Sequence, residues 1–419
     1  MSSGTNSRAP VATMHTHSPF KDRTRLAEAQ DRLLDRVTAH DRTEMVLSEA
    51  AAGRVLAEAV TARRAVPHYP RAAMDGYAVR ASDTFGAGDR SPAILREGGD
   101  PGTGAVGPGE AVQVHTGSEL PDGADAVVMV ERTETVGDEV EVFDAVAEGE
   151  NVAPVGEDVA EGQTLFEAGH RLRPSDLGLI KSVGTREVEV VERPSVAVIP
   201  TGEELVQSDP DPGEVVETNG LTVTRYVESW GVDASYRDVV TDDPDALRAA
   251  IQRDTDHDLI ATTGGSSVGE RDLLSDVVED LGELVVHGVA IKPGHPVGVG
   301  VVDGTPIVVL PGYPVSCIVT AVQLLRPAVK RAGTMPEPSF PTVEARLADK
   351  IHGEPGMRSF VRVTTETRDG ERVATRVRAS GAGVLSSVAM ADGWVVVPEA
   401  SEGIDAGETV PLENWEWSQ

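Results

Sequence analysis

The sequence predicts a multidomain α/β plus β protein. It should have a central doubly wound, mostly parallel sheet, a β domain inserted upstream and a C-terminal β-barrel-like domain. Three observations predict this class. The chain has 419 residues, which corresponds to about three domains. Apolar runs alternate with helical stretches between residues 194 and 335. Short β-favouring runs separated by Gly/Pro loops flank that region on both sides.

The chain should begin with a disordered tail over residues 1–18, which are rich in Ser, Thr, Ala and His and lack periodicity. Residues 20–52 place apolar side chains at helical spacing and predict a helical stretch. A further helix is expected over residues 175–183. We expect residues 19–66 and 150–193 to form one discontinuous linker domain.

Residues 67–149 should form the inserted β domain, because β-favouring runs alternate there with loops rich in Gly and Pro. Its expected strands cover residues 111–114, 126–130 and 139–143. The C-terminal domain, residues 336–419, shows the same patterning, with strands over 358–365, 372–378 and 393–397.

Residues 194–335 should form the α/β domain, because apolar strands separated by helices are typical of a sheet covered on both faces. The expected strands are 195–199, 234–240, 258–262, 284–291, 297–302 and 306–310. The expected helices are 219–230, 243–253, 271–281 and 314–330. Asp243 and Pro244 suit the N-cap and first position of the second helix.

The composition restricts the partners and the compartment. The formal net charge is −32, from 69 acidic and 37 basic residues, and a field of this sign repels nucleic acid and anionic membranes. The single cysteine, Cys317, cannot form an internal disulfide. The sequence has neither an apolar run of about 18 residues nor an apolar signal core near its start. We therefore expect a soluble, cytoplasmic protein.

The basic residues are unusual in kind as well as in number. Only five of the 37 are lysines, and a chain rich in acid and poor in lysine is typical of a protein adapted to high intracellular salt. A mildly acidic protein from an ordinary environment is the alternative. Lys292, which precedes Pro293 and Gly294 at the end of an expected strand, suits a fixed charge for a phosphate; a surface lysine is the alternative.

Four loops leave carboxyl ends of the expected parallel strands, where ligands bind in open α/β sheets. They cover residues 200–204, 241–243, 262–272 and 310–316. The last two combine glycines with a following helix and resemble phosphate cradles, although neither is a P-loop or a dinucleotide motif. Ordinary tight turns are the alternative.

Acidic side chains lie on three of these loops. Glu204, Asp242 and Asp272 would repel a bare phosphate bound at the predicted cradles. A divalent cation such as Mg²⁺, held between these acids and the phosphate, would remove the repulsion. Solvated acids in an acid-rich protein are the alternative interpretation.

Eight motifs occur in an order that resembles one known family. They are AAMDGYAV (72–79), VHTGSELPDGADAVVMVE (114–131), VGEDV (155–159), TGEEL (201–205), TTGGSSVGERDL (262–273), KPG (292–294), LPGYPVS (310–316) and GVLSS (383–387). Together they are similar to the molybdopterin molybdotransferases, the MoeA and gephyrin E-domain family, over about residues 20–410.

The resemblance implies an enzyme of molybdenum cofactor biosynthesis that inserts molybdate into adenylated molybdopterin and releases AMP, assisted by Mg²⁺. It further implies a homodimer whose active site lies between the α/β domain of one subunit and the MDGYA-bearing domain of the other.

Residues matched to the family's motifs receive roles by the same resemblance. The implied catalytic residues are Asp75, Thr116, Glu204, Asp242, Asp272 and Lys292. The implied metal ligands are Asp158, Glu204, Asp242 and Asp272. The implied substrate-binding residues are Gly264, Gly265, Ser266, Ser267, Gly269, His295, Pro311, Gly312, Ser316, Arg362 and Ser386.

The chain departs from the family pattern at four positions. They are Gly288 and His295, where basic residues are usual, Tyr313 in place of Asn, and Ala382 in place of Ser. The lost positive charge should weaken phosphate binding unless high salt or a neighbouring arginine compensates.

Several functions stay open at this point. One is a molybdopterin adenylyltransferase, whose fold resembles residues 194–335 alone, although the flanking domains argue against it. Others are a tungstate-preferring paralogue and a molybdopterin-binding scaffold without catalysis. The sequence does not decide between molybdate and tungstate, which are tetrahedral dianions of nearly equal size.

Overall fold

The computed structural model describes residues 23–98, 104–264, 273–377 and 383–417. The chain divides into two compact units. One, here called the insert unit, comprises residues 43–191; the other, the main unit, comprises the chain up to residue 42 and from residue 192 onward. In the described part of the chain, no helix has the length and apolar character needed to cross a membrane.

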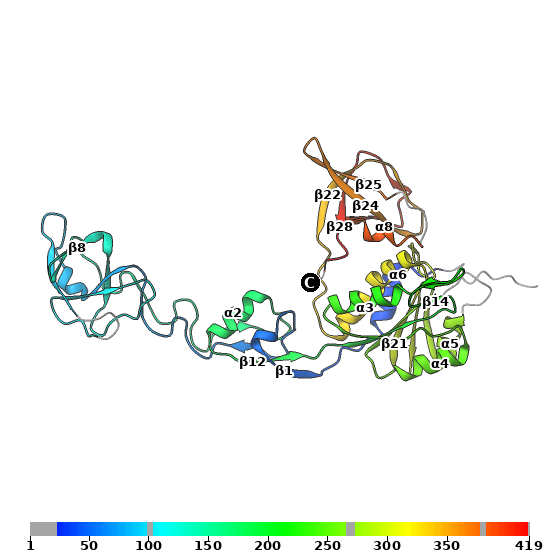
Figure 1. Ribbon diagram of the computed structural model, residues 1–419, viewed down its shortest axis with the longest axis horizontal. Coiled ribbons are helices and arrows are strands. Elements are labelled where there is room, and N and C mark those ends of the chain that lie inside the picture. The colour runs from blue at the N-terminus through cyan, green and yellow to red at the C-terminus, as the bar shows by residue number, and fades with distance from the viewer. Residues whose placement is uncertain (1–22, 99–103, 265–272, 378–382, 418–419) are drawn as a thin grey trace, which may run out of the picture. The chain divides into compact units, whose positions relative to one another are not determined.

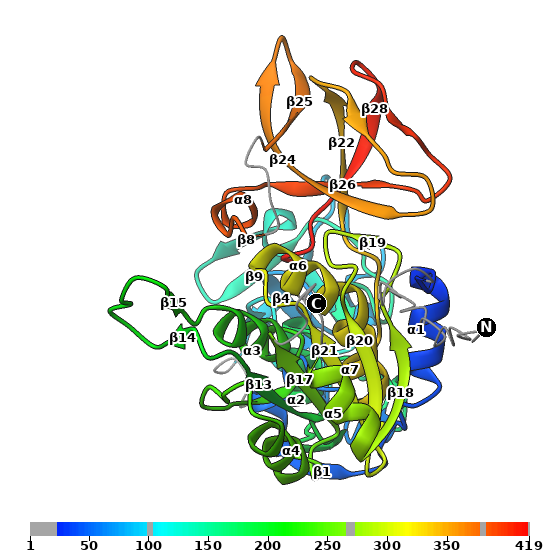
Figure 2. The ribbon, with the colours of Figure 1, turned by 90° about the vertical axis from the view of Figure 1, so that its right-hand side faces the viewer.

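The main unit contains a six-stranded sheet in the order β16-β13-β17-β21-β20-β18, of which Figure 2 labels β13, β17, β21, β20 and β18. The strands are β13 (Ser195–Pro200), β16 (Asp233–Tyr236), β17 (Leu259–Thr263), β18 (Gly282–His287), β20 (Gly298–Val302) and β21 (Thr305–Leu310). The first four in spatial order pair in parallel, and β20 and β18 add antiparallel. The prediction of a mostly parallel sheet is confirmed.

Helices cover both faces of this sheet because its strands are apolar throughout. They are α1 (Leu26–Leu34), α3 (Asn219–Ser229), α4 (Pro244–Arg253), α5 (Leu273–Leu281), α6 (Pro314–Thr320) and α7 (Arg326–Ala332). Helices α1, α3, α6 and α7 pack into one core, and α4 and α5 pack into the other. As predicted, Asp243 caps α4 by accepting hydrogen bonds from the N–H groups of Asp245 and Ala246.

The C-terminal part of the main unit is a closed barrel. Its strands are β22 (Thr342–Leu347), β24 (Arg358–Arg368), β25 (Glu371–Arg376), β26 (Gly393–Val397) and β28 (Thr409–Glu413). They pair in the order β24-β25-β22-β28-β26, and β26 pairs back to β24 (Figure 2). The barrel is fastened to the α/β region, because Phe360, Trp394 and Trp415 belong to the core that α1, α3, α6 and α7 form. The predicted barrel-like domain is confirmed.

The smaller elements of the main unit include two short strand pairs and one short helix. They are β14 (Leu205–Val206) with β15 (Val215–Val216), β23 (Ile351–His352) with β27 (Gly403–Ile404), and α8 (Ser386–Ala389).

The insert unit contains a six-stranded sheet in the order β7-β4-β6-β5-β9-β8. Its strands are β4 (Gly76–Val79), β5 (Ala93–Glu97), β6 (Glu110–Val114), β7 (Ala126–Met129), β8 (Thr133–Val136) and β9 (Glu139–Val142). Gly76 is required inside β4, because a Cβ atom there would lie 1.9 Å from the Val128 carbonyl oxygen. The predicted upstream β domain is present.

The remainder of the insert unit consists of short elements. They are β1 (Thr43–Leu47), β2 (Val60–Thr61), β3 (Arg71–Ala72), β10 (Val152–Ala153), β11 (Thr164–Phe166), α2 (Pro174–Ser182) and β12 (Glu187–Val191). Strands β1 and β12 lie side by side as an antiparallel pair (Figure 1).

This pairing corrects one prediction. Residues 20–52 are predicted to be helical, but among residues 23–52, which the structure describes, the helical elements are only α1 at 26–34 and a three-residue 3₁₀ turn at 48–50. Residues 43–47 form a strand instead, because they pair with residues 187–191, which lie 140 to 148 positions further along the chain. Helical spacing of apolar residues cannot reveal a partner so distant.

Three further elements differ from the prediction. The strand expected over 284–291 is two strands, β18 and β19 (Ile291–Lys292), and β19 pairs with β24 of the barrel. The helix expected over 314–330 contains a π segment at 321–325 between α6 and α7. The strand expected over 234–240 ends at Tyr236, and Val240 forms only an isolated bridge.

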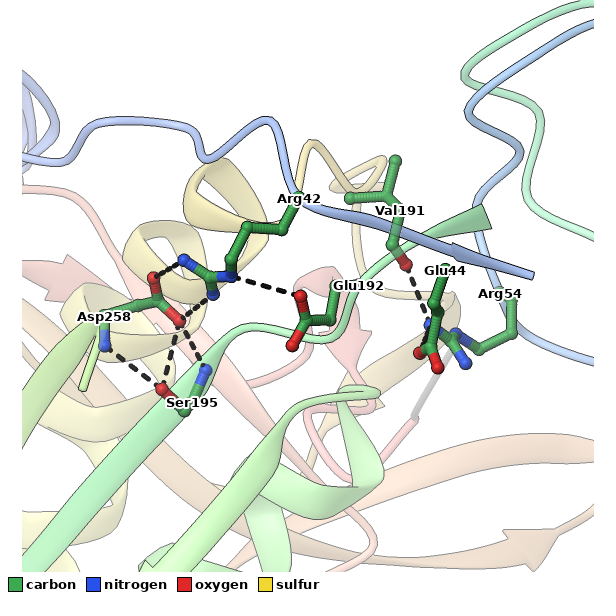
Figure 3. Close-up of polar contacts among 7 residues, drawn as sticks. All are labelled: Arg42, Glu44, Arg54, Val191, Glu192, Ser195 and Asp258. Carbon is green, nitrogen blue, oxygen red and sulfur yellow. Dashed lines mark hydrogen bonds and ion pairs between the residues drawn. The ribbon is translucent and has the colours of Figure 1, made fainter. Parts of the chain in front are cut away.

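An ion-pair network surrounds Arg42, the last residue of the main unit before the chain enters the insert unit at residue 43 (Figure 3). Arg42 donates two hydrogen bonds to the carboxylate of Asp258, at 3.0 and 2.7 Å, and contacts Glu192 at 3.3 Å. The N–H of Ser195 donates to the same Asp258 carboxylate at 2.8 Å. The first residue of β13 is thereby tied to the segment that leads into the insert unit.

Candidate functional site

Strands β13, β17 and β21 end at one edge of the main sheet, and the loops that follow them converge there. Gly264 follows β17 with φ +118°, a conformation that favours glycine. Its N–H donates to the Leu310 carbonyl at 3.1 Å, and a Cβ atom on it would lie 2.1 Å from the Thr201 carbonyl oxygen. The backbone at position 264 is therefore pressed between the ends of β13 and β21.

The loop after β21 lies against the same point. A Cβ atom on Gly312 would be 3.5 Å from the Gly264 Cα atom. Asn219, the first residue of α3, donates from Nδ2 to the Gly312 carbonyl at 2.6 Å and fixes that loop. Pro311 precedes Gly312, and Ser316 lies buried in the first turns of α6. The two loops predicted to cradle phosphate thus approach each other at Gly264 and Gly312, and residues 265–272 of the first loop lie outside the described residues.

Buried hydroxyl groups surround this edge. Thr201, Thr262 and Thr263 are at most 2% exposed, and none of their Oγ1 atoms has a hydrogen-bond partner among the described residues. Buried hydroxyls without partners cost folding free energy, and in native proteins they call for an explanation. Hydroxyl groups at the carboxyl ends of parallel strands are suited to binding a polar ligand.

Two carboxylates lie close together on the same edge. Burial raises the pKa of Asp242, and the negative charge of Glu204 raises it further. A cation held between the two would relieve this repulsion, so their chemistry fits an oxygen-ligated dication. Within the described residues, however, no group of three or more metal-binding side chains occurs. Asp272, the third acid predicted here, lies outside the described residues.

Lys292 is placed by the packing of its own loop. A Cβ atom on Gly294 would lie 2.5 Å from Thr320 Cγ2 and 3.3 Å from the Ser316 carbonyl oxygen, so this glycine lets the loop contact α6. The Lys292 ammonium forms an ion pair with Glu354 at 3.0 Å. Lys292 was predicted as a fixed charge for a phosphate, and in the structure its partner is a carboxylate of the barrel.

Three further predicted residues of the main unit lie near the barrel or on it. Burial lowers the pKa of His295, and the positive charges of Arg23 and Lys292 also lower it. Burial lowers the pKa of Arg362, whose buried Nε atom has no hydrogen-bond partner in the part of the chain that the structure describes. Ser386 is exposed at the start of α8. The loop before α8 approaches the 310–316 loop, since a Cβ atom on Gly383 would be 3.3 Å from the Tyr313 ring.

The insert unit carries the other three predicted residues. Asp75 accepts hydrogen bonds from the N–H and the hydroxyl of Thr116, at 2.6 and 2.9 Å. The N–H bond, and then the hydroxyl bond, lowers the pKa of Asp75. Asp158 is exposed on a loop, where its N–H donates to the Val66 carbonyl.

The main unit thus brings together Glu204 with Asp242, and Gly264 with Gly312. Four other predicted substrate-binding residues lie outside the described residues: Gly265, Ser266, Ser267 and Gly269. Sequence reasoning missed Thr201, Asn219 and Glu354. Thr201 lay inside a motif used for its acid, whereas no local pattern distinguishes Glu354 from the other acids of this chain.

Comparison with known proteins agrees with this arrangement of domains. Three family models match the chain in order: "MoeA N-terminal region (domain I and II)" over residues 24–184, "Probable molybdopterin binding domain" over 197–331 and "MoeA C-terminal region (domain IV)" over 344–415. A Methanocaldococcus jannaschii protein named for molybdopterin biosynthesis is 35% identical over 375 residues, which are 86% of this chain and 89% of that protein.

A molybdopterin molybdenumtransferase of Bacillus subtilis is 32% identical over 397 residues, covering 90% of this chain and 92% of its own length. The chain belongs to the MoeA family. The crystal structure of a molybdopterin biosynthesis MoeA protein from Pyrococcus horikoshii OT3 is 32% identical, with a TM-score of 0.78 over 93% of this chain and 100% of that one.

These relatives confirm the resemblance that the eight motifs carried. The MoeA fold, with its α/β domain, flanking β structure and closed barrel, extends along nearly the whole chain. The expectation of a transferase of molybdenum cofactor biosynthesis agrees with the names of the curated relatives.

Proposed function

We propose that this MoeA-family protein is a molybdopterin molybdenumtransferase, which inserts molybdate into adenylated molybdopterin and releases AMP. The observation that carries the proposal is the convergence of the loops at Gly264 and Gly312 at the carboxyl edge of the main sheet. Buried, unpartnered threonine hydroxyls lie at the same edge. The family's flanking regions accompany this α/β domain along the chain.

The chemistry requires neutralisation of charge. Cleaving a phosphoric anhydride beside an incoming dianion concentrates negative charge, and donors oriented in advance stabilise it best. We assign the phosphates of the substrate to the backbone at Gly264 and Gly312 and to the ammonium of Lys292. Arg362, whose guanidinium has an unpartnered Nε atom, and Ser386 contact substrate from the barrel.

The acids play a different role. Glu204 and Asp242 would hold Mg²⁺, which supplies Lewis-acid stabilisation of the reacting phosphate when bound. The raised pKa of Asp242 beside Glu204 supports this assignment, since a cation favours both ionised carboxylates. Asp272 and Asp158 complete the proposed ligand set. The remaining proposed substrate contacts are Gly265, Ser266, Ser267, Gly269, His295, Pro311 and Ser316.

We further propose that the protein acts as a cytoplasmic homodimer with a shared active site, in which Asp75 and Thr116 of one subunit serve the α/β domain of the other. The proposed domains are a discontinuous linker (19–66 with 150–193), the inserted β domain (67–149), the α/β domain (194–335) and the C-terminal domain (336–419); the tail predicted over residues 1–18 lies outside the described residues. No finding favours a scaffold without catalysis or a tungstate-preferring paralogue.

One incubation tests the proposal. Purified protein is mixed with adenylated molybdopterin, Mg²⁺ and either molybdate or tungstate, and AMP release is followed. We expect AMP release that depends on the oxyanion and is lost in Asp75→Asn. AMP release that is equal with and without either oxyanion would contradict the molybdotransferase assignment.

A further inference from the structure

The ammonium of Lys292 lies beside a tight turn of the barrel. Residues 354–357 form a β-turn in which the Met357 N–H donates to the Glu354 carbonyl at 2.9 Å. Pro355 and Gly356 are its central residues, and Gly356 has φ +89°, as turns with glycine in the third position favour. The Glu354 carboxylate at the start of this turn accepts the Lys292 ion pair at 3.0 Å.

A second cation is attached to the other end of the same turn. The Arg23 guanidinium lies 3.1 Å from the sulfur of Met357. Its segment is joined to the Lys292 loop by the backbone, since the Thr24 N–H donates to the Gly288 carbonyl and the Ala290 N–H donates to the Thr24 carbonyl. These bonds place Arg23 beside the loop that contains Gly288 and His295, the two positions at which basic residues are usual in the family.

The Glu354 carboxylate therefore pairs with Lys292 and is within the electrostatic influence of two further basic side chains, Arg23 and His295. Its hydrogen bond and ion pair with Lys292 lower its pKa, and the charges of Arg23 and His295 lower it further. The Lys292 and Glu354 side chains are 59% and 50% exposed, so their pair is screened by water and weak. A tetrahedral oxyanion carrying two charges would compete well with one carboxylate for such a cluster.

We propose that Glu354 is an internal competitor at the oxyanion site of Lys292, and that Arg23 is a second cation of that site. The ligand class is a tetrahedral dianion, either a phosphate group or free molybdate. On binding, the oxyanion takes the place of the Glu354 carboxylate at the ammonium, and no covalent bond changes. The inference rests on the proposed function only for the identity of the ligand that binds in the cell.

Calorimetric titration with inorganic phosphate and with sodium molybdate tests it on the full chain. In Glu354→Gln, either anion should bind roughly threefold to fivefold more tightly than in the unaltered protein, because one exposed ion pair no longer competes. The gain should shrink as KCl rises from about 0.1 M to about 1 M. A gain with one of the two anions alone would identify that anion as the source of the oxyanion.

Matched variants separate this mechanism from a general change of charge. Glu371→Gln removes one charge from another exposed ion pair of the barrel, with Arg346 at 3.0 Å, and should leave anion binding unchanged. Arg23→Gln should weaken binding. In a Lys292→Met background, Glu354→Gln should no longer tighten binding. Thermal unfolding of each variant verifies that it is folded.

Equal affinities of Glu354→Gln and the unaltered protein for both anions would overturn the inference. So would the same gain in Glu371→Gln or in the Lys292→Met background. These outcomes are independent of the proposed function, because they concern binding of inorganic anions. A protein that releases no AMP, but whose Glu354→Gln variant binds anions more tightly, would lose the proposed function and keep this inference.

Discussion

The carboxylate of Asp75 is held by Thr116 through two hydrogen bonds, one from the backbone N–H at 2.6 Å and one from Oγ1 at 2.9 Å. Asp75 lies immediately before β4, and Thr116 follows β6, its antiparallel neighbour. Two donors on one carboxylate favour its ionised form and orient it. Both residues were matched to family motifs separately, and the structure shows that they form a pair.

The Asp75–Thr116 pair predicts a shift in pH dependence. Thr116→Val removes one of the two donors, so the pKa of Asp75 should rise and the acidic limb of AMP release should move to higher pH. Thr116→Ser keeps the hydroxyl and should preserve the profile of the unaltered protein. An unchanged acidic limb in Thr116→Val would show that the ionisation of Asp75 does not limit the reaction.

Lys292 predicts a large effect on rate. Lys292→Ala removes a point charge from the proposed phosphate site and should slow AMP release by about 10²–10³ while the protein stays folded. Lys292→Arg should rescue only partly, because a planar guanidinium does not replace a compact ammonium. His295→Lys should tighten substrate binding, most visibly at low salt. Lys350→Ala is the control, because Lys350 also pairs with an exposed carboxylate, Asp405, at 2.7 Å. AMP release by Lys292→Ala at the rate of the unaltered protein would place the phosphate site elsewhere.

Asp242 predicts opposite effects on stability and activity. Because burial and then Glu204 raise its pKa above the unfolded value, its ionised form destabilises the fold above that folded pKa. Asp242→Asn should therefore raise the unfolding temperature at pH 7 by roughly 1–3 °C, and should lower AMP release. Its neighbour Asp243 caps α4, so Asp243→Ala should lower the unfolding temperature. A lower unfolding temperature in Asp242→Asn would contradict the proposed strain between the two carboxylates.

The network around Asp258 predicts a loss of stability in acid. Burial alone would raise the pKa of Asp258, but hydrogen bonds from Arg42 and Ser195 outweigh burial and hold the pKa below its usual value. This stabilisation is present above the unfolded pKa of about 4 and is lost as the pH falls through the folded pKa. Arg42→Ala should remove about 1 kcal/mol at pH 7 and shift acid unfolding to higher pH.

A control variant separates this network from an exposed ion pair. Arg36 pairs with Glu283 at 2.8 Å, and the two side chains are 43% and 52% exposed. Arg36→Ala should change the free energy of unfolding by less than about 0.5 kcal/mol. Equal losses in the two variants, measured by urea unfolding at pH 7, would argue that the Asp258 network contributes nothing beyond an exposed pair.

The charge of the chain predicts a requirement for salt. With a formal net charge of −32, repulsion among acidic side chains acts over about 10 Å at 0.1 M KCl and over about 3 Å at 1 M. The temperature of thermal unfolding should therefore rise as KCl increases between these concentrations. A midpoint that does not respond to KCl would contradict adaptation to high salt.

Local sequence patterns predicted the regular parts of this protein. The apolar strands at 195–199, 258–262 and 306–310 are β13, β17 and β21 within a residue or two, because a strand buried on both faces needs apolar residues throughout. The Asp243–Pro244 pair marked the start of α4, since capping involves neighbours in the chain. Motifs of several residues were sufficient to identify the family.

Local sequence patterns did not predict which distant segments pair with one another. Residues 43–47 became a strand because residues 187–191 lie beside them, and residues 291–292 joined the barrel through β24. The close approaches at Gly264 and Gly294 depend on strands and helices that are distant in the chain. Periodicity reports which face of an element is buried, but it does not report what covers that face.

The sequence by itself determined the fold class, the family and the residue types at the proposed site, because each of these depends on composition and on short-range order. The tertiary structure decided which charges meet. Lys292 pairs with Glu354, the Thr116 hydroxyl donates to Asp75, and the negative charge of Glu204 raises the pKa of Asp242. Electrostatic interactions depend on separation in space and on burial, and both arise only when distant segments pack together.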